Sequence, residues 1–187
     1  MKLLIIDNYD SFTFNLKHMC EPYVKSVNVI RNDQININDI VKYDKIIISP
    51  GPGLPQDAGL SLEIIKKFSN SKSILGVCLG AQAIAVAFDL TLYNLQNVMH
   101  GKISKIKIIN SDSDIYKGLP KEIKVCRYHS WAVKINSEDE FLITAKDAHN
   151  TIMSFQHKFF SLTAIQYHPE SVLTKYGGEI LKNWLIN

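Results

Sequence analysis

Runs of consecutive apolar residues alternate with amphipathic segments through the first half of this chain. Runs such as residues 3–6 and 46–48 contain no polar residue, so a strand formed from either has apolar side chains on both faces. Such strands are typical of a parallel sheet that is covered by helices on both sides, because each face of the strand is then buried. The alternation therefore predicts an α/β fold built from βα units.

The first half is expected to supply the parallel part of this sheet. Its expected strands are residues 2–6, 27–31, 45–49 and 73–77, and its expected helices are residues 12–23, 60–68 and 79–88. In the second half, strand-like segments follow one another with only polar turns between them. These are residues 103–109, 123–127, 131–135, 141–145, 152–156 and 161–167, and an expected helix at 177–186 closes the chain. We expect the later strands to extend the sheet or to form an antiparallel cap.

Length and composition limit the classes of protein to consider. The 187 residues, 46% of them hydrophobic, can bury one sizeable core, and no linker or repeat divides them, so we expect a single domain over residues 1–187. The net charge is only +3 and the basic residues are dispersed, which argues against a nucleic-acid partner. The apolar runs are too short to span a membrane. Three scattered cysteines favour a reducing compartment, and we expect a cytoplasmic protein without a cofactor.

One cysteine lies in a segment that favours reactivity. Gly76-Val77-Cys78-Leu79-Gly80 follows an expected strand and precedes an expected helix. This is the strand-turn-helix pattern of a nucleophile elbow, with cysteine in the place of serine. Unpaired N–H groups and the positive end of the helix dipole at a helix N-terminus favour the thiolate form of a cysteine. Cys78 is therefore the candidate nucleophile.

A base and an orienting acid for Cys78 occur late in the chain. Pro169 favours an extended conformation for His168, and residues two apart in an extended segment point to the same side. His168 and Glu170 can therefore lie side by side, as a carboxylate that holds an imidazole in one tautomer requires.

Cys78 also needs backbone donors that stabilise an oxyanion. The N–H of Leu79 is one candidate, because it follows the nucleophile and begins the helix. The turn Ser49-Pro50-Gly51-Pro52-Gly53-Leu54-Pro55 offers others, but its prolines have no N–H. Only Gly51, Gly53 and Leu54 can donate from that turn.

These segments together resemble the class I glutamine amidotransferases, and the resemblance covers nearly the whole chain. It is carried by residues 76–80 with Gln82, by residues 49–53, and by His168-Pro169-Glu170-Ser171. Residues 7–13, 98–102 and 127–130 further resemble one branch, the glutaminase subunits of anthranilate synthase and para-aminobenzoate (aminodeoxychorismate) synthase.

The resemblance implies a glutaminase that passes ammonia to a separate chorismate-using synthase subunit. Cys78 would attack the side-chain amide of L-glutamine, His168 would protonate the departing ammonia, and Glu170 would orient His168. The resemblance further implies two sets of substrate contacts. The oxyanion would be bound by Gly51, Gly53 and Leu79, and the α-amino and α-carboxylate groups would be bound by Gln82, Ser130 and Trp131.

Two residues depart from the family pattern. Ala81 stands where relatives commonly have histidine, which can alter local packing. Trp131 stands where they often have leucine, which can change the wall of the pocket. Neither departure touches the three catalytic candidates.

Other interpretations of these residues stay open. The same elbow could serve a stand-alone γ-glutamyl thiol hydrolase or belong to a catalytically silent binding subunit. Partner-dependent activation could act through a peptide flip in the turn at residues 51–53. Neither a G-x-G-x-x-G segment after the first strand nor a P-loop occurs, which argues against nucleotide binding.

The remaining candidates are given structural roles. Cys20 and Cys126 are expected in the core. The spacing of Cys126 and His129 resembles that of metal ligands, but no second closely spaced pair completes a site, which argues against metal binding. Asp10 and Ser11 precede an expected helix, so N-capping is the economical role for them, with subunit contact as the alternative.

Overall fold

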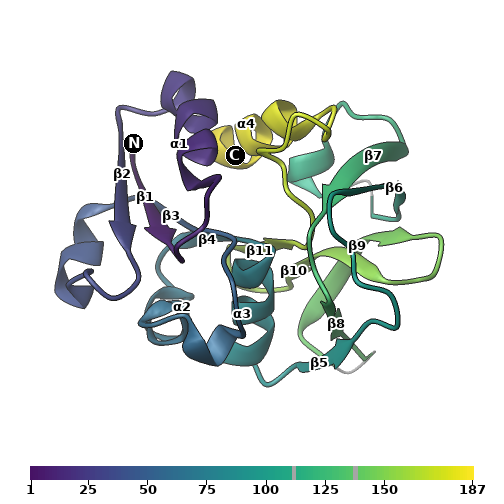
Figure 1. The fold of residues 1–187 in the computed structure, drawn as a ribbon. Helices are drawn as coiled ribbons and strands as arrows, with labels where there is room; N and C mark the ends of the chain where they lie inside the picture. The colour runs from purple at the N-terminus through teal and green to yellow at the C-terminus, as the bar shows by residue number, and fades with distance from the viewer. Residues whose placement is uncertain (111–112, 137–138) are drawn as a thin grey trace.

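The structure is a computed structural model that describes residues 1–110, 113–136 and 139–187. Within these residues, nine strands form one sheet in the order β2-β1-β3-β4-β11-β10-β9-β6-β7 (Figure 1). The first five strands in that order run parallel to one another. They are β1 (Lys2–Asp7), β2 (Ser26–Arg31), β3 (Lys45–Ile48), β4 (Ser73–Val77) and β11 (Leu162–Ile165). The expected parallel sheet is confirmed, and the last strand of the chain joins it beside β4.

The other four strands extend the sheet in antiparallel fashion. They are β10 (Ile152–His157), β9 (Phe141–Asp147), β6 (Lys102–Ile108) and β7 (Glu122–Arg127). The expected strand at 131–135 forms as β8 (Trp131–Lys134), but it lies outside this sheet and pairs with β5 (Thr91–Asn94). The sequence does not predict β5, because four residues with only Leu92 and Tyr93 apolar are too short an alternation to identify a strand.

Helices cover both faces of the parallel half, as Figure 1 shows. One face is covered by α1 (Thr13–Cys20) and α4 (Gly177–Ile186), and the other by α2 (Ser61–Phe68) and α3 (Leu79–Ala87). Short 3₁₀ turns lie at Glu21–Tyr23, Ile37–Lys42, Pro55–Asp57 and Asp114–Tyr116. All four expected helices are confirmed to within two residues, apart from the end of the first, where Glu21–Tyr23 continues as a 3₁₀ turn.

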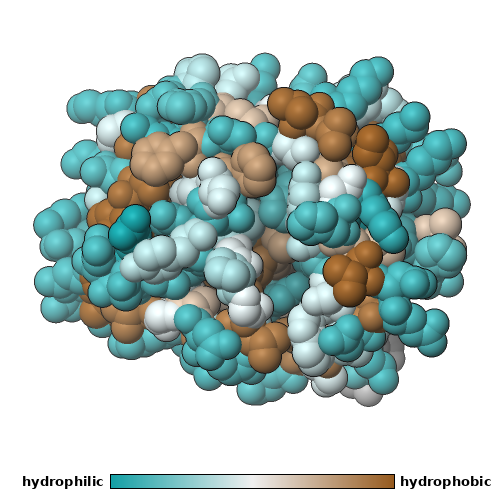
Figure 2. Space-filling model, viewed as in Figure 1, coloured by the Kyte–Doolittle hydropathy of each residue, from teal (hydrophilic) through white to brown (hydrophobic). Residues whose placement is uncertain are grey.

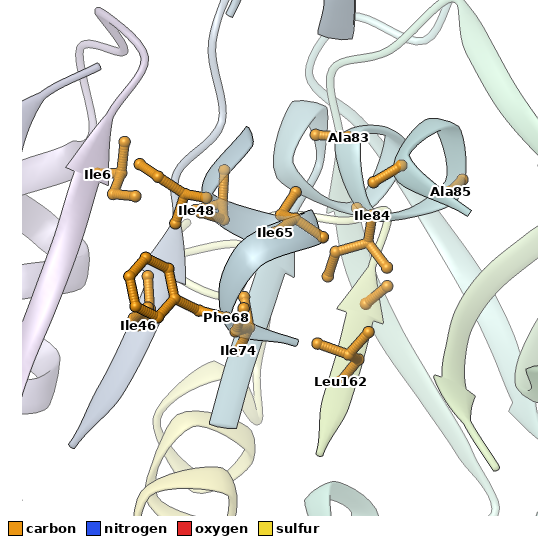
Figure 3. Close-up of a cluster of buried hydrophobic side chains, with 14 of the residues drawn as sticks. Ile6, Ile46, Ile48, Ile65, Phe68, Ile74, Ala83, Ile84, Ala85 and Leu162 are labelled. Atoms are coloured by element: carbon orange, nitrogen blue, oxygen red, sulfur yellow. The ribbon is translucent and has the colours of Figure 1, made fainter. Parts of the chain in front are cut away.

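The apolar strands divide their side chains between two cores, as the sequence pattern predicts. In β1, Leu3 and Ile5 pack toward α1 and α4, whereas Leu4 and Ile6 pack toward α2 and α3. Figure 3 shows Ile6 together with other residues of the second core, including Ile48 of β3. Each fully buried side chain of this size contributes roughly 1.5–3 kcal/mol to stability. A slip of one residue would exchange the two faces, so close packing on both sides fixes the register.

The parallel strands bring distant segments of the chain to one edge of the sheet. Because β3, β4 and β11 are neighbours and run in the same direction, their carboxyl ends lie side by side. The segments that follow these ends begin at Ser49, Cys78 and Gln166. Open α/β sheets bind ligands at this edge.

Two further observations concern the surface and the helices. In the view of Figure 2 the surface is mostly hydrophilic, with hydrophobic residues scattered in small groups. Among the described residues, no helix has both the length and the apolar composition needed to cross a bilayer.

Candidate active site

Cys78 occupies a sharp turn between β4 and α3. It is the N-cap residue of α3 and has φ 52° and ψ −102°, a conformation that costs a non-glycine residue of order 1–3 kcal/mol. The glycines on either side make the turn sterically feasible. A Cβ on Gly76 would overlap the carbonyl of Gly80, and a Cβ on Gly80 would overlap the carbonyl of Ile48 in the adjacent strand. The predicted elbow geometry is therefore present.

His168 and Glu170 form a buried pair. Nδ1 of His168 lies 2.5 Å from Oε1 of Glu170, and each residue is only 4% exposed. The segment is fastened to β7, because the His168 N–H donates to the carbonyl of Cys126 at 3.0 Å. The Thr174 hydroxyl donates to the carbonyl of His168 at 2.6 Å and accepts a hydrogen bond from the Cys126 N–H at 3.0 Å. These contacts hold the imidazole in one orientation.

The structure also brings His168 to Cys78. Burial lowers the pKa of the His168 imidazole, but the close approach of Cys78 and Glu170 outweighs burial and raises that pKa well above its ordinary value of 6.5. Nε2 of His168 is buried and has no hydrogen-bond partner of standard geometry among the described residues. It is thus the ring nitrogen available to exchange a proton with the Cys78 sulfur.

A pocket of about 170 Å³ opens beside Cys78. One water needs about 10–15 Å³ of such space, so the pocket has room for roughly a dozen non-hydrogen atoms, the size of a free amino acid. Its lining residues are Gly51, Pro52, Gly53, Cys78, Leu79, Gln82, Tyr128, His129, Ser130 and Trp131. Seven of the nine predicted site residues are in this set. His168 adjoins it, because the Tyr128 ring packs edge-on against His168 with centroids 5.1 Å apart, and Glu170 is hydrogen-bonded to His168.

The glycine turn lies against the elbow. A Cβ placed on Gly51 would come within 3.0 Å of the Leu79 side chain and 2.5 Å of the Asn8 carbonyl, so the turn is tightly packed from both sides. Asn8 supports the start of the turn, since its Nδ2 donates to the Ser49 carbonyl at 2.9 Å and its N–H donates to the Ser49 hydroxyl at 2.8 Å. The N–H of Leu54, a candidate donor from the sequence, instead points to Asp57 at 3.4 Å.

The predicted N-capping role of Asp10 and Ser11 is wrong. The N-cap residue of α1 is Phe12, and no side chain caps the helix. The Asp10 carboxylate accepts the Phe12 N–H two residues ahead, at 2.8 Å, an Asx turn that precedes the first helical residue. Asp7 also anchors this segment, because its carboxylate accepts hydrogen bonds from the Asp10 N–H and the Thr13 hydroxyl.

A buried ion pair lies behind the pocket. Nη1 of Arg127 is 2.6 Å from Oδ2 of Asp147, and both side chains are almost fully buried. Nε of Arg127 donates to Nε2 of His129 at 3.0 Å, so the ring proton of neutral His129 is on Nδ1, which lies 2.7 Å from the Trp131 carbonyl. Burial, followed by the Arg127 charge, lowers the pKa of His129 to about 4.

This lowered pKa predicts sensitivity to acid. His129 has a pKa near 6.5 in the unfolded chain and about 4 in the folded protein, so the unfolded state binds more protons between these values. Lowering the pH from 7 to 5 is expected to reduce the free energy of unfolding by about 2 kcal/mol through this residue. Urea unfolding at both pH values measures the loss. The loss should shrink in His129→Asn but not in His18→Asn, and equal losses in all three proteins would contradict the assignment.

The other two cysteines have the core positions expected of them. Cys20 and Cys126 are fully buried, and burial raises the pKa of the Cys20 thiol to about 12, which makes it unreactive. Across the described parts of the chain, no three His, Cys, Asp or Glu side chains are grouped to hold a metal ion. Both ring nitrogens of His129 are engaged in the contacts to Arg127 and Trp131.

Four residues in and around the site were not assigned a role from the sequence. They are Asn8, Arg127, His129 and Gln166, which is the residue that follows β11. Asn8, Arg127 and Gln166 each form a side-chain hydrogen bond with a residue that is distant in the sequence. His129 forms one with the nearby Trp131 carbonyl. The sequence indicates them only by position, because each lies near the end of an expected strand, in a segment that also contains a candidate residue.

The first residue of α4 packs directly on the histidine segment, which leads to a mutational prediction. A Cβ on Gly177 would overlap the Pro169 carbonyl, whereas a Cβ on neighbouring Gly178 would meet only the end of Met19 at 3.9 Å. Gly177→Ala is expected to destabilise the protein by about 1–3 kcal/mol and to displace His168. Gly178→Ala should be neutral or stabilising, by up to about 1 kcal/mol. Thermal unfolding of both variants tests this pair, and equal effects would contradict it.

Comparisons with known proteins show the family of the chain. The family profile described as "Glutamine amidotransferase class-I" matches residues 4–187. The chain is 45% identical to anthranilate synthase component 2 of Pyropia yezoensis over 187 residues, covering 98% of each protein. It is 42% identical to aminodeoxychorismate synthase component 2 of Klebsiella aerogenes, again covering 98% of each.

The fold has a close match among solved structures. A crystal structure of a protein assigned as part of a GMP synthase from Thermoplasma acidophilum superposes with a TM-score of 0.87 at 28% identity, covering 99% of this chain and 92% of that one. The sequence match spans almost every residue, and the structural match extends over the whole sheet and its helices. The chain belongs to the class I glutamine amidotransferase family.

Proposed function

We propose that this chain is the glutaminase subunit of a chorismate-using synthase. The observation that carries the proposal is the placement of the Cys78 thiol at the N-terminus of α3, beside the buried His168–Glu170 pair and at the wall of a pocket of amino-acid size. A thiol, a base and an orienting acid in this arrangement are the parts that nucleophilic catalysis requires.

The first half of the reaction forms a covalent intermediate. His168 holds the proton of Cys78, and the thiolate attacks the side-chain amide carbon of L-glutamine. The resulting tetrahedral intermediate collapses when His168 gives its proton to the amide nitrogen, which leaves as ammonia. A glutamyl thioester on Cys78 remains. Glu170 keeps the imidazole oriented and stabilises its charged form.

Backbone donors at the elbow serve the oxyanion. The N–H of Leu79 is at the start of α3, where the helix dipole favours negative charge. The turn that contains Gly51 and Gly53 packs against the Leu79 side chain, which supports a shared oxyanion site. Such donors act on charge that develops in the transition state, so they contribute more to turnover than to binding.

The hydrogen bonds of Gln82 support its role in holding the α-amino group. Its Nε2 donates both hydrogens, to the Trp131 carbonyl at 3.1 Å and to Oε1 of Gln166 at 3.2 Å. The carbonyl oxygen of the Gln82 amide is therefore the atom left to act on a ligand, and it can only accept, as an ammonium group requires. The α-carboxylate can only accept, so Ser130 and Trp131 serve it through their N–H groups.

The second half of the reaction releases glutamate. Water attacks the thioester carbonyl while His168 removes its proton, and the Cys78 thiolate leaves. The net change is glutamine plus water to glutamate plus ammonia. Ammonia then passes to the partner subunit.

Several observations support the wider context. The relatives named above are component 2 proteins of anthranilate synthase and of aminodeoxychorismate synthase, which favours a chorismate-using component 1 as partner in tryptophan or folate synthesis. The family match over residues 4–187 supports a single amidotransferase domain over residues 1–187. Three free thiols support a reducing compartment such as the cytoplasm.

The turn at residues 51–53 is the element we propose for activation by the partner. Gly53 has φ +78°, a conformation open to glycine, so rotation of a peptide there can turn an N–H toward or away from the pocket. A partner that binds one orientation more tightly shifts this equilibrium by its difference in affinity.

Glutamate release tests the proposal and separates the two pathways. The purified chain is assayed with glutamine and chorismate, first alone and then with an anthranilate-forming or an aminodeoxychorismate-forming component 1. Stimulation by one partner supports the proposal and identifies the pathway. Activity on γ-glutamyl peptides without a partner favours a stand-alone hydrolase. An absence of turnover under every condition favours a silent binding subunit.

A further inference from the structure

Gln166 lies between the nucleophile and Gln82. It is the first residue after β11, is only 2% exposed, and is anchored by its N–H, which donates to the Met153 carbonyl at 2.9 Å. Its side-chain Nε2 is 3.7 Å from the Cys78 sulfur, and its Oε1 is 3.2 Å from Nε2 of Gln82. The reaction outlined above assigns no role to this amide.

The orientation of the Gln166 amide follows from its neighbours. The Trp131 carbonyl can only accept, so the atom of Gln82 that lies 3.1 Å from it must be the nitrogen. That nitrogen also faces the Gln166 amide, which must present its oxygen in return. The nitrogen of Gln166 is then the atom directed at Cys78.

The Trp131 carbonyl is itself held by a hydrogen bond from His129. It lies 2.7 Å from Nδ1 of His129, whose other nitrogen accepts from Arg127, and Arg127 is paired with Asp147 at 2.6 Å. The donor and the acceptor of each hydrogen bond in this buried series are thus determined, from the ion pair to the sulfur. Linked hydrogen bonds in a buried site strengthen one another and favour one arrangement.

We propose that Gln166 is a further catalytic residue, whose side-chain N–H donates to the Cys78 thiolate, while its carbonyl oxygen fastens it to Gln82. A hydrogen bond to the charged form of an acid favours that form, and a charged acceptor forms a stronger hydrogen bond than a neutral one. Gln166 therefore stabilises the attacking sulfur and sets it at a fixed place relative to the residue that holds the α-amino group. The role in turnover rests on the proposed glutaminase function, but the effect on the thiolate does not.

Alkylation of Cys78 by iodoacetamide tests the proposal without glutamine, because only the thiolate reacts. Two variants keep the length of the side chain. Gln166→Met removes the donor, and Gln166→Glu keeps an oxygen for Gln82 but places a carboxylate beside the sulfur. Gln156→Met, in β10, is the matched control at a glutamine remote from the pocket. Labelling in Cys78→Ala gives the background from Cys20 and Cys126.

The alkylation rate at neutral pH is expected to fall about tenfold in Gln166→Met and further in Gln166→Glu, with the midpoint of the pH profile moved upward in both. Gln156→Met should match the wild type. A wild-type pH profile in either Gln166 variant, with thermal unfolding showing that variant folded, would overturn the proposal. If the shifts appear but no condition yields glutamate, the thiolate role stands and the glutaminase function fails.

Discussion

Replacement of Cys78 by serine is expected to lower glutamate release from glutamine by at least roughly 10⁴-fold. A hydroxyl is a far weaker acid than a thiol, and the buried His168–Glu170 pair and the amide of Gln166 are arranged around the sulfur atom of a thiol. Serine in this position is left protonated and forms no acyl intermediate. Coupled assay of glutamate in the presence of the stimulating partner measures the loss.

A matched control separates chemistry from stability. Cys20→Ala removes a buried thiol from α1 and is expected to retain most of the activity, because Cys20 packs in the core and does not line the pocket. Substantial glutamate release by folded Cys78→Ser would show that another group is the nucleophile.

Replacement of His168 by glutamine is expected to lower turnover by roughly 10²–10⁴-fold. Glutamine at this position cannot take the thiol proton or return it to the leaving nitrogen, so both the attack and the departure of ammonia lose their proton carrier. Glu170 holds the imidazole, and Cys126 and Thr174 hold the backbone of His168. Because His168 is only 4% exposed, solvent can replace little of its effect. The kcat with saturating glutamine is the quantity to measure.

Two further variants sharpen this test. Glu170→Gln keeps the shape of the orienting group but removes its charge, and it should give a smaller loss than His168→Gln. His18→Gln alters an exposed histidine on α1 and should have no effect. A kcat within tenfold of wild type in His168→Gln would exclude His168 as the acid and base.

Most of the parallel half of the fold could be predicted from the sequence, because its signals are local and repeated. Strand β1 is apolar from Leu3 to Ile6 and strand β3 from Ile46 to Ile48, so both strands show the continuous apolar runs of a sheet buried on both faces. The elbow at Cys78 is also local, since its glycines, strand and helix are contiguous. Strand β5 gave no such signal, because only its contact with β8 makes it a strand.

The part of the site that could not be predicted depends on contacts across the fold. Gln166 is 88 residues from Cys78 in sequence, and its amide acquires a role only when β4 and β11 lie side by side. Asn8 supports the glycine turn only because β1 is next to β3. The capping prediction for Asp10 failed for a different reason, because its carboxylate can bond the N–H before the helix as well as one inside it.

Transfer of nitrogen from glutamine is the most direct test of the central claim. Glutamine labelled with ¹⁵N in its amide is given to the chain together with chorismate and the stimulating component 1, and the aminated product is analysed by mass. We expect ¹⁵N in the product of the wild-type complex and no labelled product with Cys78→Ala, while added ammonium salt restores amination to that variant. Labelled product from Cys78→Ala, or a wild-type complex that takes nitrogen only from free ammonium, would contradict the proposed function.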